Sequence, residues 1–205
     1  MGDNADPHNH NGPTNDVIEQ RTWDWFHATV AARFGPAHYR VAAHRPNDHW
    51  PDVIALRGHE EVGFEITSPL KPEDVVRRPV PAANNGASAG GEADEEGISR
   101  QKLLEQRVVG ALKRKIKKYG AQSTQLPLAL LITLAHPSTL KFSSTKSDVA
   151  HLASVVRGHF GKFLHQPIDA VYLVGPGEKA YLLWRRRGPK WKKLFPELDE
   201  VTART

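Results

Sequence analysis

The stretch PDVIALRGHEEVGFEIT, residues 51–67, contains the pattern that decides the fold. Residues 51–56, Pro-Asp-Val-Ile-Ala-Leu, are typical of a short buried strand. Residues 57–60 read Arg-Gly-His-Glu, a composition that favours a tight turn. From residue 61 to residue 67, apolar residues alternate with polar or small ones, as expected for a half-buried strand. The stretch therefore predicts a β-hairpin.

Two carboxylates lie at corresponding places in this hairpin. Asp52 opens its first strand and Glu65 lies near the end of its second, so the hairpin brings them side by side. Two carboxylates on a rigid sheet form a hard-oxygen site that is suited to Mg²⁺. An equally open interpretation is that both acids simply face solvent. Gly63, beside them, fits either close approach of a substrate or metal or an ordinary strand glycine.

Helices and strands alternate around the hairpin. Apolar residues at helical spacing predict an amphipathic helix between Asp16 and Gly35. The nearly continuous apolar run over residues 126–135 is typical of a strand that is covered on both faces. The remaining expected elements are a strand over 37–44, a basic helix over about 98–119, a helix over 148–164, and strands over 168–174 and 179–184. The order α-β-β-β-α-β-α-β-β predicts an α/β fold with a central mixed β-sheet flanked by helices.

A length of 205 residues with 39% hydrophobic content suits one core. We therefore expect a single domain over residues 15–188. Before it we expect a disordered tail over residues 1–14, and after it a basic C-terminal tail over residues 189–205. Residues 80–98 are rich in Ala, Gly, Asn and Glu and predict a flexible insertion.

Composition excludes several classes of protein. No apolar run of about 18 residues is present, so we expect no membrane span, and the polar N-terminus lacks the apolar region of a secretory signal. The chain has no cysteine, which excludes disulfides, thiolate nucleophiles and cysteine zinc sites. We expect a cytoplasmic protein. The sequence indicates no oligomeric state.

The net charge of +5 is concentrated in two segments. Residues 102–118 hold seven Lys or Arg against one acid, and residues 185–193 hold six against none. Clustered positive charge favours a phosphate-backbone partner, although a solvated helix face and a solvated tail show the same pattern. We expect the partner to be DNA, with RNA left open. The expected nucleic-acid contacts are Lys113, Lys117, Lys118, Arg185, Arg186, Arg187, Lys190 and Lys192.

The hairpin motif resembles the PD-(D/E)XK signature of restriction-endonuclease-like nucleases. Pro51 is followed by Asp52, and about a dozen residues later Glu65, Ile66 and Thr67 occur in sequence. The order of helix, hairpin, basic helix and buried strand resembles the same family over roughly residues 15–135. The resemblance implies a restriction-endonuclease-like core and metal-dependent phosphodiester hydrolysis.

The same resemblance implies roles for particular residues. The carboxylates of Asp52 and Glu65, with the main-chain carbonyl of Ile66, would bind Mg²⁺ or Mn²⁺. The family also takes a further acid from the preceding helix, where Glu19 falls. The spacing from Asp16 to Glu19 equally fits a helix-capping box.

One position departs from the family pattern. The family lysine falls at Thr67, which carries no positive charge, but some members place this lysine on the following helix. Lys115 lies inside the apolar arc of that helix, one turn before Tyr119, while most other basic residues lie outside the arc. An ammonium on a core-facing stripe needs a partner, so we nominate Lys115 as the displaced lysine. The alternatives are that Lys115 reaches out along the stripe to solvent, or that Lys118 takes the role.

The sequence thus predicts a metal-dependent endonuclease that hydrolyses DNA phosphodiester bonds. Its expected catalytic residues are Asp52, Glu65, Lys115 and Glu19. The alternative is a catalytically inactive nucleic-acid-binding module on a nuclease fold, which the threonine at position 67 favours.

Overall fold

The computed structural model describes residues 15–44, 51–69, 100–120, 126–134, 146–160, 167–176 and 179–198. The predicted N-terminal tail over residues 1–14 and the predicted insertion over residues 80–98 lie outside this part of the chain. Among the described helices, none is long and apolar enough to cross a membrane.

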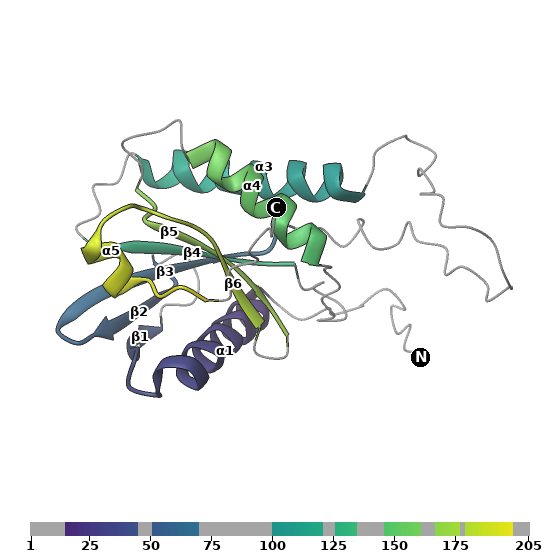
Figure 1. Ribbon diagram of the computed structural model, residues 1–205. Coiled ribbons are helices and arrows are strands. Elements are labelled where there is room, and N and C mark those ends of the chain that lie inside the picture. The colour runs from purple at the N-terminus through teal and green to yellow at the C-terminus, as the bar shows by residue number, and fades with distance from the viewer. Residues whose placement is uncertain are drawn as a thin grey trace, which may run out of the picture.

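A six-stranded mixed sheet in the order β1-β2-β3-β4-β5-β6 forms the centre of the fold (Figure 1). The first three strands form an antiparallel meander, β4 and β5 run parallel to β3, and β6 returns antiparallel to β5. The strands are β1 (Arg40–His44), β2 (Val53–Arg57), β3 (Glu60–Thr67), β4 (Leu128–Thr133), β5 (Ala170–Gly175) and β6 (Lys179–Arg185). The predicted α/β fold with a mixed sheet is confirmed.

Helices cover both faces of this sheet. α1 (Asn15–Phe34) lies on one face, while α3 (Arg100–Gly120) and α4 (Lys146–Phe160) lie on the other (Figure 1). All six residues of β4 are buried, as expected for a strand between two layers of helix. The sheet therefore separates two apolar cores, one under α1 and one under α3 and α4.

The β2–β3 hairpin turns through Gly58, whose positive φ of 65° glycine adopts without the steric cost that a Cβ atom brings. Beyond the turn the side chains of β3 alternate. Val62, Phe64 and Ile66 enter the core under α1. Glu65, which lies between them in sequence, therefore points to the α3 face.

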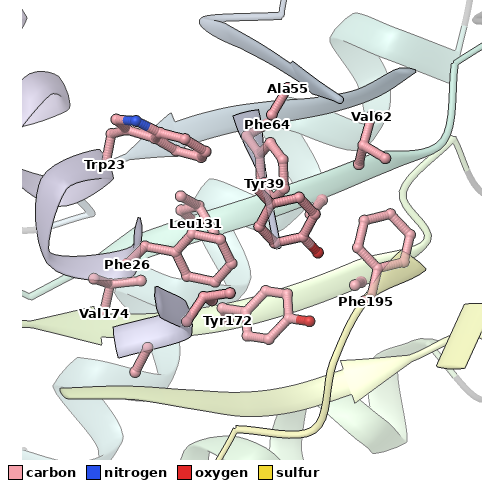
Figure 2. Close-up of a cluster of buried hydrophobic side chains, with 14 of the residues drawn as sticks. Trp23, Phe26, Tyr39, Ala55, Val62, Phe64, Leu131, Tyr172, Val174 and Phe195 are labelled. Carbon is pink, nitrogen blue, oxygen red and sulfur yellow. The ribbon is translucent and has the colours of Figure 1, made fainter. Parts of the chain in front are cut away.

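Aromatic packing fixes α1 against the sheet (Figure 2). The ring of Phe26 lies 5.4 Å from that of Phe64 on β3 and 5.0 Å from that of Tyr172 on β5. Trp23 lies 5.1 Å from Phe64. Such offset and tilted ring pairs stabilise a core beyond their area burial. Glu19, one turn before Trp23, is thereby held at a fixed place relative to β3.

The C-terminal segment differs from the tail predicted over residues 189–205. α5 (Pro189–Leu194) and the residues after it pack into the core under α1, where Leu194, Phe195 and Leu198 are fully buried. The Tyr39 hydroxyl donates to the Leu194 carbonyl, and the Tyr172 hydroxyl donates to the Pro196 carbonyl at 2.9 Å. Domain packing therefore extends to residue 198, because the apolar residues among the lysines are buried while the lysines face solvent.

Candidate active site

The register of the hairpin places the two motif carboxylates opposite each other. Val53 pairs with Phe64 at the end of the β2–β3 ladder. Asp52, before Val53, and Glu65, after Phe64, are therefore the next residues on the two sides of the hairpin. Asp52 Oδ2 accepts a hydrogen bond of 2.6 Å from the Ile66 N–H. This bond fixes the Asp52 carboxylate at the end of the strand pair, beside Glu65.

Lys115 reaches these carboxylates from α3. Lys115 Nζ and the Tyr119 hydroxyl both contact Glu65 Oε1. Residues spaced by four share one face of a helix, which explains why both side chains arrive at one oxygen. Glu65 is only 3% exposed and Lys115 is 21% exposed, so this ion pair is largely shielded from water. Lys118 Nζ, the alternative candidate, lies 5.4 Å from the centre of the Tyr119 ring.

The other oxygen of Glu65 has a different environment. Oε2 is buried and receives no hydrogen bond from the described part of the chain. A buried carboxylate oxygen without a donor is costly, and such atoms are uncommon in folded proteins. A bound cation is one group that would satisfy it.

Negative charge exceeds positive charge at this end of the hairpin. Burial and, next to it, the negative charge of Glu65 raise the pKa of Asp52 to about 7, although the hydrogen bond from the Ile66 N–H acts in the opposite direction. Burial also raises the pKa of Glu19, while the positive charge of Lys115 lowers it. When ionised, three carboxylates and one ammonium leave a net charge of −2, which one divalent cation would balance.

The residues present fit a small oxygen-ligand set. Within the described residues, no three His, Cys, Asp or Glu side chains form a group that could hold a metal. The fitting set is therefore Asp52, Glu65 and a main-chain oxygen. The Ile66 carbonyl qualifies, because its N–H faces Asp52 and the two main-chain groups of one strand residue point to the same side. Glu19 contributes charge to the site without completing a set of three carboxylate ligands.

The predicted nucleic-acid contacts fall into separate groups. Lys113, Lys117 and Lys118 are exposed on α3, whose inner side carries Lys115. This basic face therefore belongs to the same layer as the carboxylate site.

The second basic segment, residues 185–193, lies elsewhere. Arg185 donates to the Phe195 carbonyl at 2.7 Å, and Arg186 pairs with buried Asp169 at 2.7 Å, so both support the fold. Arg187, Lys190 and Lys192 are exposed. Because α5 packs with the core under α1, this segment and the α3 lysines lie on opposite faces of the sheet.

The sequence places Tyr119 inside the apolar arc of its helix, one turn after Lys115. Its side chain is fully buried, yet its hydroxyl ends on the Glu65 carboxylate. Burial raises the pKa of Tyr119, and the hydrogen bond to Glu65 acts in the same direction, so the hydroxyl remains a donor. A tyrosine on an apolar stripe, one turn after a lysine, is the pattern in the sequence that indicates its place beside the carboxylates.

Comparison with known proteins found no relative of this chain. No protein-family model, no curated protein and no solved structure matches the chain.

Proposed function

We propose that this protein is a divalent-metal-dependent endonuclease that hydrolyses DNA phosphodiester bonds, with a restriction-endonuclease-like core. The observation that carries this proposal is the contact of Lys115 with Glu65, directly beside Asp52. It gives the site the ammonium that the threonine at position 67 cannot provide. Two acids, one lysine and a hairpin scaffold together match the chemistry that the motif implies.

Asp52, Glu65 and the Ile66 carbonyl would hold Mg²⁺ or Mn²⁺. The unsatisfied Oε2 of Glu65 and the raised pKa of Asp52 both support a cation there, because Oε2 lacks a donor and the Asp52 carboxylate is buried beside the negative charge of Glu65. When bound, such an ion lowers the pKa of a coordinated water and offsets charge on the phosphoryl group. Mg²⁺ usually takes few protein ligands and retains several waters, which agrees with this small set.

The remaining residues act on the phosphate and on the site itself. Lys115 stabilises the negative charge that develops on the phosphate oxygens as water attacks. Tyr119 is a positioning residue, since its hydroxyl and the Lys115 ammonium hold the same oxygen of Glu65. Glu19 adds negative charge beside Lys115 and strengthens the potential that would hold the cation.

The substrate would lie along the α3 face. Exposed lysines of α3 contact phosphates, and such contacts hold the backbone without reading its sequence. We therefore expect cleavage without a fixed target sequence. The α5 lysines, on the other face of the sheet, are not part of this path.

The test is conversion of supercoiled plasmid to nicked or linear DNA. The parent should cleave with Mg²⁺ or Mn²⁺ and not with EDTA, and Glu65→Gln should be inactive. Glu61→Gln is the matched control, because Glu61 is an exposed acid on the same strand and face. A single-stranded RNA of similar length, assayed in parallel, distinguishes DNA from RNA as the substrate.

The threonine at position 67 favours a second candidate, the inactive nucleic-acid-binding module. That function is supported if no metal allows cleavage but the protein still binds DNA in a salt-dependent manner. Loss of both cleavage and binding contradicts both candidates.

A further inference from the structure

Gly63 lies on the same face of β3 as Glu65, two residues before it. A Cβ atom on Gly63 would lie 2.8 Å from Cγ of Pro51 and 3.3 Å from Cδ1 of Leu128. The Pro51 ring therefore occupies the space that a side chain at position 63 would need. Pro51 and Gly63 are both buried, so this is a close contact inside the protein.

The position of Pro51 shows where the chain leaves the β2–β3 ladder. If the register continued past Val53 and Phe64, residue 51 would lie opposite Ile66. Ile66 is three residues beyond Gly63, about 10 Å along the strand at roughly 3.3 Å per residue. The ring lies over Gly63 instead, so the chain turns off the ladder at Asp52 and folds back over the α3 face of β3.

This turn determines what the main-chain groups of Ile66 can bind. The Gly63 N–H bonds to the Pro127 carbonyl on the β4 side, at 2.8 Å. Main-chain groups of successive strand residues point to alternate sides, so those of Ile66 point to the β2 side. There the N–H donates to Asp52 Oδ2, and residue 51 supplies no ladder donor for the carbonyl. A proline at position 51 also has no N–H to offer.

We propose that Pro51 and Gly63 are positioning residues of the metal site: their contact turns the chain off the ladder at Asp52, which leaves the Ile66 N–H to Asp52 and the Ile66 carbonyl to the cation. This inference rests on the proposed function, because it concerns the ligands of the same cation. The inference therefore gives Gly63 a role of its own: the missing side chain makes room for the Pro51 ring, not for a substrate or metal.

The consequence is a defined sensitivity to side chains at position 63. Gly63→Ala introduces a methyl group at 2.8 Å from Pro51 Cγ, a separation at which one group must move. Leu128 can yield through its flexible end, whereas the Pro51 ring is attached to the chain that carries Asp52. The displacement therefore reaches Asp52, which is the next residue of the chain.

The experiment measures Mn²⁺ affinity by titration calorimetry and exchange of the Ile66 amide by NMR, on folded protein. The Leu130 amide of β4 serves as the reference for global opening. Gly63→Ala should weaken Mn²⁺ binding at least tenfold and accelerate Ile66 exchange at least tenfold relative to Leu130. The double variant Gly63→Ala/Pro51→Ala removes the clashing ring atom and should recover both quantities to within about threefold of the parent. Gly110→Ala is the control, since its Cβ would meet no atom closer than 3.6 Å.

The outcomes separate the inference from the proposed function. If the parent binds Mn²⁺ and Gly63→Ala binds it equally well with unchanged Ile66 exchange, Pro51 and Gly63 only pack together and the inference is wrong. If Gly63→Ala is impaired and the double variant does not recover, the ring is not the cause and the inference is again wrong. If the parent does not bind Mn²⁺, the metal site itself is overturned, and Ile66 exchange then decides whether the contact still positions Asp52.

Discussion

Replacement of Lys115 by methionine isolates the ion pair on which the proposed active site depends. Methionine keeps the unbranched shape and most of the length of the side chain and removes its charge. Breaking a buried ion pair costs about 3–5 kcal/mol because the remaining charge is left without compensation. Glu65 is 3% exposed and meets this condition, but Lys115 is 21% exposed, so water already screens part of the interaction. We expect Lys115→Met to lower the free energy of unfolding by about 2–3 kcal/mol, which is less than a fully buried pair would cost.

The assay is urea unfolding at pH 7.5 in EDTA, so that no cation compensates Glu65. Lys113→Met and Lys117→Met serve as matched controls, because both lysines are exposed on the same helix. Each should change the free energy of unfolding by no more than about 0.5 kcal/mol. Adding Glu65→Gln to Lys115→Met removes the uncompensated charge, so the double variant should be less destabilised than the sum of the single variants.

Catalysis gives the second measurement on the same variants. Lys115→Met should abolish most cleavage while binding remains near the parent value. Thr67→Lys, added to Lys115→Met, should restore part of the cleavage, because position 67 lies on the same face of β3 as Glu65. An unfolding free energy for Lys115→Met within about 0.5 kcal/mol of the parent refutes the buried pair. Parent-like cleavage by Lys115→Met refutes its catalytic role.

Other predictions concern metal, substrate and pH. Glu65→Ala should abolish Mg²⁺-dependent cleavage and leave DNA affinity nearly unchanged, measured by fluorescence anisotropy; retained cleavage contradicts the assignment. Lys113→Ala with Lys117→Ala should lower the slope of log affinity against log salt by about 1.8, at about 0.9 per phosphate for duplex DNA, and an unchanged slope excludes them as contacts. Burial lowers the pKa of His38 to about 4, so folding keeps it neutral where the unfolded chain is protonated. Its contribution to stability is present above pH 6.5 and is lost as pH falls towards 4; His38→Phe should retain about 2 kcal/mol more stability than the parent between pH 7 and pH 4.5, and parallel pH profiles would contradict this.

The elements that the sequence predicted well are those with strong local periodicity. Alternation over residues 61–67 identifies β3 and its buried face, and the apolar run of β4 identifies a strand between two layers. Lys115 could be nominated for the same reason, since its angular place on α3 depends only on neighbours within a few turns. Local spacing therefore predicted which side chains would lie beside Glu65.

Features that depend on distant contacts were not predictable in this way. Phe195 and Leu198 occur among lysines and prolines without a regular period, and their segment is held by hydroxyls of Tyr39 and Tyr172. Tyr39 lies 155 residues before the carbonyl that it binds. The contact of Pro51 with Gly63 is closer in sequence but depends on how the chain leaves the ladder. Neither the packing of the C-terminal segment nor the contact of Pro51 with Gly63 follows from a periodic pattern in the sequence.

Under the proposed function, the positive charge that Thr67 does not provide can come from another element of the fold. A residue at that position would point to the α3 face of the sheet, the same face as Glu65. Lys115 approaches Glu65 from the helix that covers this face, so an ammonium arrives at the same carboxylate from the opposite layer. Because a lysine ammonium is a compact charge on a flexible side chain, it can reach the same place from a helix or from a strand. A motif defined by spacing along β3 specifies which position carries the lysine. The proposed chemistry depends instead on where the ammonium group lies. A lysine on α3 can therefore take the place of one on β3.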